Sequence, residues 1–111
     1  MSDNLIDFSE FQKVEIIVAR IVSAEPVAGT DKLIKMQVDD GRGGRQMVAG
    51  IAPWIKPQEL IGLHVPIVAN LKPAKLRGEL SEGMLLAAQD DKGNLSLVVM
   101  QKEIAPGSLV K

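Results

Sequence analysis

The stretch "APWIKPQELIGLHV", residues 52–65, places one short helix in a chain whose other segments have the composition of β-strands. Pro57 suits the first position of a helix, because its missing N–H would have no partner there and its φ angle is already helical. Gly62 can end the helix one turn later. A single short helix between two strand-rich parts of the chain restricts the folds that the chain can adopt.

Three strands are expected before this helix. Residues 14–27, "VEIIVARIVSAEPV", are rich in valine and isoleucine, the composition of a long strand. Residues 32–40 alternate between apolar and polar side chains, which is typical of a half-buried strand. A glycine-rich turn at 40–44 is followed by residues 45–51, which we expect to return as the third strand.

Three more strands are expected after the helix. Residues 65–71 form the first, and Pro66 within it favours an edge strand or a strand start. Residues 83–88, "GMLLAA", have the composition of a buried strand. A turn at 90–94 leads to the last strand at 95–100.

Short strands at close intervals, interrupted by one helix, predict an all-β fold of the OB type. This fold is a partly open five-stranded Greek-key barrel, here with its small helix between strands 3 and 4. An SH3-like barrel or a small sandwich would also account for the strands. The length of 111 residues suits one domain, 1–111, with a core of about 13–100 and a docked tail at 101–111.

A second short helix is expected at the N-terminus. Asp7 can cap it, and Glu10 lies at the spacing of a capping box, with Ile6 and Phe11 at the positions of a hydrophobic staple. Phe8 and Phe11, three residues apart, would share one face of this helix. Because an exposed pair of rings is costly to solvate, we expect these rings to seal the domain or to form a subunit contact.

The composition excludes several classes of chemistry. The chain has no cysteine, which removes disulfides, thiolate zinc sites and a cysteine nucleophile, and fits a reducing compartment. The first thirteen residues are acidic and lack a long apolar run, so we expect no secretory leader. No segment has the length and hydrophobicity of a membrane span, and we expect a cytoplasmic protein without a membrane partner.

The distribution of charge is uneven. The net charge is -1, but residues 32–77 hold eight basic and three acidic residues, a balance of +5. The remainder of the chain has a balance of -6. Such asymmetry can arise by chance in a small protein, and it points to an anionic partner only if the basic side chains share a face.

Few residues are candidates for catalysis. His64 is the only histidine, and it is expected to lie where a loop enters a strand. The adjacent pairs Asp39–Asp40 and Asp90–Asp91 lie in glycine-containing turns, where aspartate stabilises the local backbone. The chain has neither a phosphate-binding loop nor a dinucleotide fingerprint. We therefore predict a protein that is not an enzyme and has no metal or cofactor.

A basic stretch from residue 70 to residue 81 favours a binding function instead. Its hydrogen-bond donors are Asn70, Lys72, Lys75, Arg77 and Ser81. Lysine and arginine bind phosphate, whereas asparagine and serine can contact sugar hydroxyls or base edges. In an OB-fold, the connection between the fourth and fifth strands is one of the loops that bind oligonucleotides. The alternative is a solvated loop that happens to be basic.

The shortage of aromatic residues bears on the mode of binding. Proteins that bind single strands stack bases on aromatic rings, at about 1–3 kcal/mol per base. This chain has no tyrosine, and its phenylalanines are assigned to the first helix. Trp54 is expected to pack at the barrel mouth under the small helix. We therefore expect recognition of the shape and backbone of a folded RNA.

Four motifs in the sequence resemble those of the tRNA-binding domain family. They are "NLKPAKLRG" at 70–78, "SEGMLLAA" at 81–88, "MVAGI" at 47–51 and "PQELIG" at 57–62. The family includes the domain appended to methionyl-tRNA synthetases and small stand-alone tRNA-binding proteins. The resemblance extends from about Phe8 to the end of the chain.

The resemblance implies an OB-fold that binds the outer corner of tRNA without strong sequence preference. It also implies a homodimer and a methionyl-tRNA synthetase catalytic chain as a possible partner. The family's binding positions fall on Asn70, Lys72, Lys75, Arg77, Ser81 and Met84, with Lys32 as a further phosphate contact. Our candidates for the dimer interface are Phe8, Phe11, Ile104 and Leu109.

Two positions depart from the family pattern. Ile17 stands where the first strand of the family usually has an arginine, so a contact from that strand is not carried over. Residues 27–33, "VAGTDKL", replace the family's usual H-P-x-A-D-K-L and are closer to the synthetase-appended branch. Two other functions are considered: a dimeric, peptide-binding chaperone of a related, secretion-associated branch, and a purely structural dimerising appendage.

Overall fold

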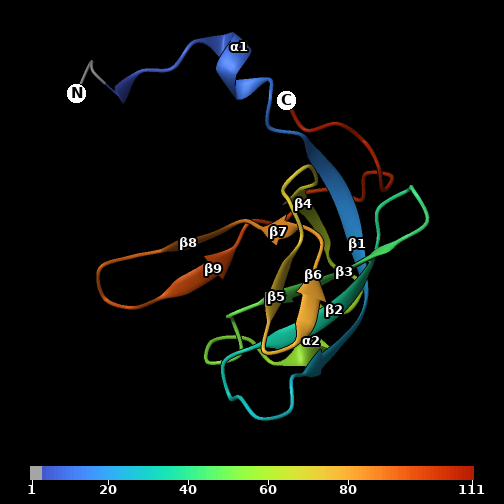
Figure 1. Cartoon of the computed structure of the whole chain (residues 1–111), viewed down its shortest axis with the longest axis vertical. Helices are drawn as coiled ribbons and strands as arrows, with labels where there is room; N and C mark the ends of the chain where they lie inside the picture. The colour runs from blue at the N-terminus through green and yellow to red at the C-terminus, as the bar shows by residue number, and fades with distance from the viewer. Residues whose placement is uncertain (1–3) are drawn as a thin grey trace.

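β1 (Ile16–Pro26) lies in the middle of a five-stranded antiparallel sheet in the computed structural model (Figure 1). The structure describes residues 4–111. The strands of the main sheet follow the order β3-β2-β1-β4-β7. The other elements are α1 (Phe8–Phe11), β2 (Ile34–Asp39), β3 (Arg45–Ala49), α2 (Pro57–Leu60), β4 (His64–Val68), β5 (Ala74–Leu76), β6 (Glu79–Ser81), β7 (Met84–Leu85), β8 (Ala87–Gln89) and β9 (Leu95–Leu97).

The two halves of β1 pair with different strands. Residues 16–20 pair with β4 and residues 20–26 pair with β2, and the register shifts between Ile21 and Ser23. A shift of this kind increases the local bend and twist of a strand. The bent strand curls the sheet into a nearly closed barrel, with α2 between β3 and β4. This arrangement confirms the predicted OB-fold.

Aliphatic side chains from β1 to β4 fill the barrel. In β2 the predicted alternation is confirmed, because Ile34, Met36 and Val38 are buried whereas Gln37 is exposed. Burial of such a side chain contributes about 1.5–3 kcal/mol. The helix α2 covers one end of the barrel with Leu60, which is fully buried.

The barrel closes between β3 and the chain that leaves β6, without a regular ladder. Gln46 O accepts a hydrogen bond from the Glu82 N–H at 2.8 Å, and Glu82 Oε1 accepts one from the Gln46 N–H at 3.2 Å. The Val48 N–H donates to Ser81 Oγ at 3.0 Å. Side-chain oxygens thus take the place of backbone carbonyls and satisfy the edge of β3.

The prediction of one buried strand at 83–88 is wrong. The chain forms β7, which pairs with β4 at the edge of the main sheet, and then β8, which pairs with β9 in a separate hairpin. This hairpin extends away from the barrel (Figure 1), and Ala87 and Ala88 are exposed. The expected strand at 95–100 ends at Leu97 for the same reason, since the hairpin partner is short.

Trp54 does not pack under the small helix as expected. Its side chain is 41% exposed, and its indole N–H donates to the carbonyl oxygen of Gly93 at 2.8 Å. Gly93 lies in the turn between β8 and β9. Trp54 therefore connects the β8–β9 hairpin to the chain that precedes α2.

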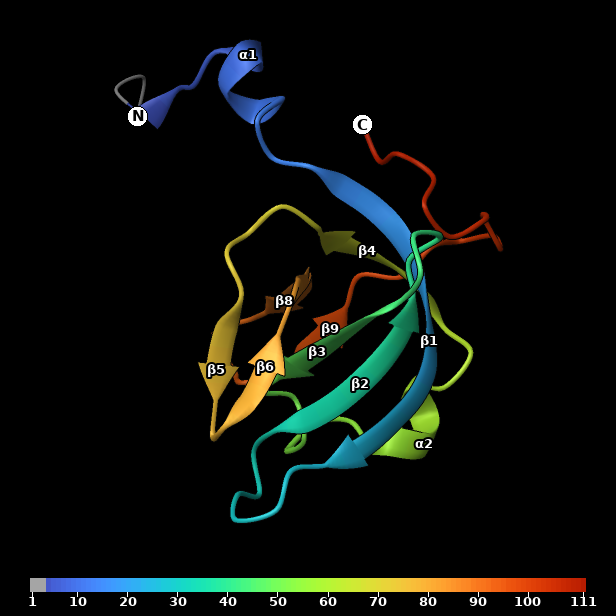
Figure 2. The same cartoon turned by 45° about the vertical axis from the view of Figure 1, so that its right-hand side comes forward.

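The helix α1 protrudes from the barrel (Figures 1 and 2). Asp7 is its N-cap, but the carboxylate makes no capping hydrogen bond. The rings of Phe8 and Phe11 lie 6.4 Å apart, and Phe8 is 71% exposed. The expectation that they seal the domain is wrong, because α1 buries none of its residues. No helix within residues 4–111 is long and apolar enough to cross a membrane.

The C-terminal tail runs beside the first half of β1. The Val18 N–H donates to Ser108 O at 2.9 Å, the Gly107 N–H donates to Val18 O at 2.8 Å, and the Val110 N–H donates to Ile16 O at 2.8 Å. Here β1 has β4 on one side only, because β2 pairs with its second half. The tail therefore covers a strand edge that would otherwise be open.

Gly83 should be intolerant of a side chain. A Cβ at this position would lie 3.0 Å from Met47 Sδ and 3.2 Å from the carbonyl oxygen of Val68, inside the closure of the barrel. We expect Gly83→Ala to lower the free energy of unfolding by about 1–3 kcal/mol, measured by urea denaturation. Gly50→Ala is the matched control, because its methyl would lie 4.0 Å from the nearest atom, Leu33 Cδ2. Equal denaturation midpoints for the two variants would contradict this account.

Candidate nucleic-acid interface

β5 and β6 form a two-stranded hairpin that carries much of the basic stretch. The two residues that connect the strands, Arg77 and Gly78, have φ angles of 53° and 81°. Positive φ at both central positions is typical of a type I′ turn, whose twist matches that of a hairpin. The expected loop is therefore an ordered hairpin with Arg77 at its tip.

The hairpin distributes its cations over different faces. Successive side chains of a strand point to opposite sides. Ala74 and Leu76 line a groove beside the barrel, together with Lys72. Lys75 lies between these two residues on β5 and pairs with Leu80, so it points to the opposite face. Lys72, Lys75 and Arg77 are thus close in the fold but do not share one face, so a single anionic partner would have to contact both sides of the hairpin.

The tip of the hairpin lies at the same end of the barrel as the loop between β1 and β2 (Figures 1 and 2). Lys35 Nζ, near the start of β2, lies 3.5 Å from Glu25 Oε1 and 3.5 Å from Glu79 Oε1. Glu79 follows the Arg77–Gly78 turn directly. This bridge brings Lys32, which is in the β1–β2 loop, to the same end as Arg77.

Ion pairs divide the basic residues of 32–77 into two groups. Lys35, Arg42 and Arg45 each pair with a carboxylate. The hydrogen bond from Arg42 lowers the pKa of Glu15. The other five form no ion pair within residues 4–111: Lys32, Lys56, Lys72, Lys75 and Arg77. These cations are available for an anionic partner.

Asp40 and Arg45 form a buried ion pair behind this surface. Asp40 is 2% exposed, and its Oδ2 accepts a hydrogen bond from Arg45 Nε at 2.8 Å. Its Oδ1 accepts two more from the N–H groups of Arg42 and Gly44. Burial alone would raise the pKa of Asp40, but the hydrogen bonds from these three donors and the charge of Arg45 lower it. The aspartate holds the turn, as the sequence predicted, and Asp90 does the same between β8 and β9.

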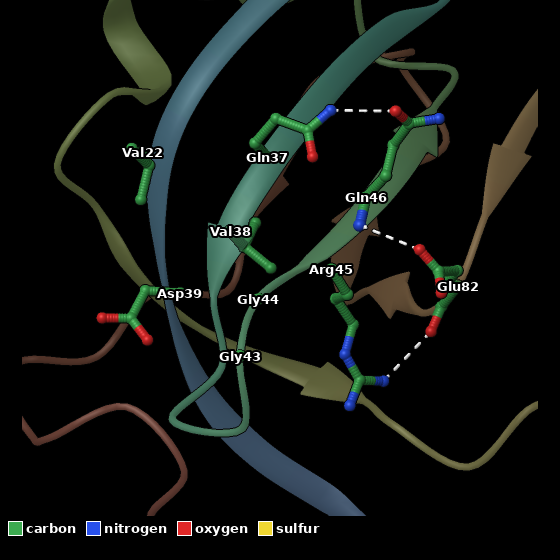
Figure 3. Close-up of a pocket in the computed structure, with 9 residues that line it drawn as sticks. All are labelled: Val22, Gln37, Val38, Asp39, Gly43, Gly44, Arg45, Gln46 and Glu82. Atoms are coloured by element: carbon green, nitrogen blue, oxygen red, sulfur yellow. Dashed lines mark hydrogen bonds between the residues drawn. The ribbon is translucent and has the colours of Figure 1, made fainter.

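A cleft of about 620 Å³ lies on the outer side of β2 and β3 (Figure 3). Gln37 Nε2 donates to Gln46 Oε1 there at 2.8 Å, and the cleft also holds the carboxylates of Asp39 and Glu82. Its one cationic side chain, Arg45, is occupied by internal hydrogen bonds. Because two carboxylates repel phosphate, this cleft is a poorer site for an RNA backbone than the β5–β6 hairpin.

Two of the predicted contacts are used inside the protein. Ser81 ends the strand β6 and is buried, and its hydroxyl oxygen accepts a hydrogen bond from the Val48 N–H where the barrel closes. Asn70 is exposed, but its Oδ1 accepts from the Glu15 N–H and its Nδ2 donates to Lys13 O at 2.6 Å. Asn70 therefore ties the end of β4 to the start of β1 and positions the chain that leads to Lys72.

Lys56 is a further cation near this surface that was not among the residues predicted from the sequence. It precedes α2, and the Ala52 N–H nearby donates to the carbonyl oxygen of Lys32 at 3.1 Å. This contact places the segment that leads to α2 beside the β1–β2 loop. Nothing in the local pattern of charge distinguished Lys56 from a solvated lysine, because its relation to Lys32 depends on the fold.

The residues considered for catalysis lie apart from the basic hairpin. His64 begins β4 and is half-buried, as expected for a residue between a loop and a strand. Within residues 4–111, no three His, Asp or Glu side chains are grouped so that they could hold a metal ion.

Comparison with known proteins agrees with the interpretation of the chain as an RNA-binding domain. The family described as "Putative tRNA binding domain" matches residues 16–109. The chain is 48% identical over 106 residues to the methionine–tRNA ligase of Methanocaldococcus jannaschii, and 50% identical over 107 residues to that of Clostridium tetani. The alignments cover 96% of this chain but 16% and 17% of the two ligases. The chain thus spans about a sixth of the length of these curated relatives.

Solved structures give the same result. The fold is similar to that of a MetRS-related protein from Pyrococcus horikoshii, with a TM-score of 0.93 and 40% identity over 97% of this chain and 99% of that one. It is also similar to the chaperone CsaA of Bacillus anthracis strain Ames, with a TM-score of 0.87 and 24% identity over 96% of this chain and 99% of that one. At that identity, the second similarity concerns the fold alone.

The barrel and its loops define a module of the OB type, a fold that binds oligonucleotides and oligosaccharides in many proteins. The chain belongs to the tRNA-binding domain family. Within it, the chain is a tRNA-binding domain of the methionyl-tRNA synthetase type. This family is one of binding domains and not of catalytic domains.

The buried ion pair between Asp40 and Arg45 predicts how the free energy of unfolding depends on pH. The pKa of Asp40 in the folded protein is below its ordinary value of 3.8, so its carboxylate contributes stability above about pH 4. That contribution is lost as the pH falls through the folded-state pKa. We expect Asp40→Asn to lower the free energy of unfolding by about 3 kcal/mol at pH 7, because Arg45 loses its counter-charge.

The measurement is urea denaturation between pH 7 and pH 3, in which Asp40→Asn should show a shallower loss of stability on acidification than the native chain. Asp90→Asn is the control, because Asp90 accepts similar backbone hydrogen bonds but is exposed. If the two variants unfold at the same urea concentration at pH 7, the Asp40–Arg45 pair does not have the role assigned to it.

Proposed function

We propose that this chain binds folded tRNA through the β5–β6 hairpin and the β1–β2 loop, and catalyses no reaction itself. In this proposal it recruits tRNA to a methionyl-tRNA synthetase, as an appended module or a separate subunit, or acts as a stand-alone tRNA-binding protein. This role places it in the cytoplasm. The support comes from Lys32, Lys72, Lys75 and Arg77, which form no ion pair within residues 4–111, and from the identity to methionine–tRNA ligases.

The conformation of Arg77 is the observation that carries the proposal. A non-glycine residue at a φ of 53° has a conformational cost of about 1 kcal/mol, and asparagine or glycine is preferred at this position of a type I′ turn. Arg77 forms no ion pair within residues 4–111 that would offset this cost. A strained arginine at an exposed tip is explained if its guanidinium binds phosphate outside the protein.

Four phosphate contacts are a weak interface at cellular salt. Each neutralised phosphate contributes roughly 0.7–0.9 to the slope of log affinity against log salt. Affinity should therefore fall steeply with salt, and the chain by itself should discriminate little between tRNAs. Discrimination would belong to the catalytic subunit, while this module raises the local concentration of tRNA.

Removal of single cations should weaken tRNA binding. We expect Lys75→Ala and Arg77→Asn each to reduce affinity for bulk folded tRNA and to flatten the salt slope by about one unit. Asparagine keeps the turn geometry at position 77, so its effect reports the charge and not the fold. The measurement is a gel shift across a salt series.

Lys102→Ala is the control, because Lys102 is exposed but lies outside the hairpin and the β1–β2 loop. If Lys75→Ala and Arg77→Asn retain the native affinity and salt slope, these residues are not phosphate contacts. If the native chain binds no tRNA even at low salt, the proposed function is wrong.

We also propose that the chain forms a homodimer through α1 and the C-terminal tail. Phe8, Phe11, Ile104 and Leu109 are all exposed large hydrophobic residues. Leu109 bridges to Ile17 near the start of β1, the strand that follows α1 along the chain. In Figures 1 and 2 this end of the molecule lies opposite the tip of the β5–β6 hairpin. Such a dimer would leave both basic surfaces free.

Substitution in α1 should produce monomers. We expect Phe8→Ser, by removing an exposed apolar ring from the contact, to shift sedimentation equilibrium from dimer to monomer without loss of folding. Ile61→Ser is the control, because Ile61 is also exposed but follows α2 at the other end of the barrel. A native chain that sediments as a monomer at all concentrations would refute the dimer proposal.

A further inference from the structure

A groove of about 210 Å³ lies between the β5–β6 hairpin and the barrel, at the side of the basic surface. Leu71 and Leu76 line it from the hairpin segment, and Met84 lines it from β7. Lys72 stands in the same lining, and no acidic side chain does. The groove therefore combines apolar walls with a single cation.

The apolar walls of the groove are unusually exposed. Leu71 is 48% exposed and Met84 is 46% exposed, and Leu76 also belongs to the exposed large hydrophobic residues. A single exposed leucine needs no explanation, but a cluster of such side chains around one groove marks an interaction site. These three side chains do not belong to the cluster of residues that fills the barrel core.

We propose that this groove takes one unpaired nucleobase of the bound RNA. The inference rests on the proposed function and goes beyond it, because contacts to phosphate alone require no apolar groove. A nucleobase has two flat apolar faces and carries its phosphate on the adjoining sugar. Leu71, Leu76 and Met84 would contact the faces of the base, and Lys72 would contact the phosphate.

The size and chemistry of the groove suit this occupant. A cavity of about 150 Å³ accepts one benzene ring, so a groove of about 210 Å³ has room for one base. The Met84 thioether provides the sulfur–aromatic contact that methionine makes with flat rings. The chain is poor in aromatic residues, and these aliphatic side chains supply the base-contacting surface that rings supply in other RNA-binding proteins.

Charge distinguishes this groove from the larger cleft in Figure 3. That cleft contains Asp39 and Glu82, which would repel the phosphate next to an inserted base. The groove contains Lys72 instead, and Arg77 lies at the tip of the hairpin that lines it. The complementarity of charge therefore favours a nucleotide over an uncharged apolar segment of a peptide.

The test uses the 111-residue chain and three short RNA duplexes whose paired strands are identical. The first duplex has a single bulged adenosine, the second has an abasic nucleotide at the bulge, and the third has no bulge. We expect the bulged adenosine to be bound roughly threefold to tenfold more tightly than the abasic RNA. Leu71→Ala and Met84→Ala should abolish this difference without changing the salt slope, because contact with a base releases no counterion. Both positions are exposed, so truncation should leave the fold intact.

Val22→Ala is the matched control, since Val22 has the same exposed fraction as Met84, 46%, and lines the larger cleft. It should retain the preference for the bulged adenosine. Equal binding of the bulged and abasic RNAs would overturn the inference, and so would a preference lost in Val22→Ala and kept in Leu71→Ala. In either case the proposed function survives if Lys75→Ala still flattens the salt slope.

Two further outcomes would also overturn the inference. If no RNA binds the native chain, the proposed function fails together with the groove. If a labelled leucine-containing peptide binds, and Leu71→Ala weakens that binding while RNA does not compete, the groove is a peptide site.

Discussion

The contact between Asp40 and Arg45 is the constraint on which the rest of the barrel depends. Asp40 receives hydrogen bonds from its own turn and from Arg45 Nε, while Arg45 Nη1 donates to Ala69 O and Glu82 O at 2.9 and 3.0 Å. One guanidinium thus joins the β2–β3 turn, the end of β4 and the connection that leaves β6. A buried charge without its partner would be strongly destabilising, so the two ends of the sheet are held in one arrangement.

Closure of the barrel decides where the basic hairpin stands. Ser81 and Glu82 bond to β3, and Lys35 bridges Glu25 and Glu79, so both ends of β6 are attached to the barrel. The two partly exposed ion pairs of Lys35 each contribute little, about 0–1 kcal/mol. Their effect is geometric: they leave Arg77 at a free tip, while three other cations of the same region are neutralised within the protein.

Much of the fold could be predicted because its signals are local. The alternation in β2, the Pro57 start of α2 and the valine-rich β1 each indicate an element without reference to distant residues. Prediction failed at 83–88 and at Trp54, where the composition was apolar but the segment lies outside the barrel core. Composition reports that a strand is apolar. Composition does not indicate which other strand an apolar strand pairs with. The pairing of β8 with β9 removed the second half of the 83–88 segment from the barrel.

The sequence by itself determined the class of fold, the family motifs at 70–88 and the type of residue available for binding phosphate. Only the tertiary structure decided which of those residues are free. Lys35 meets Glu79 across 44 positions of sequence, Arg42 meets Glu15 across 27, and Ser81 meets Val48 across 33. Side chains so far apart in the chain have no pattern of spacing that marks them as partners, because their contact exists only once the strands are paired and the barrel is closed.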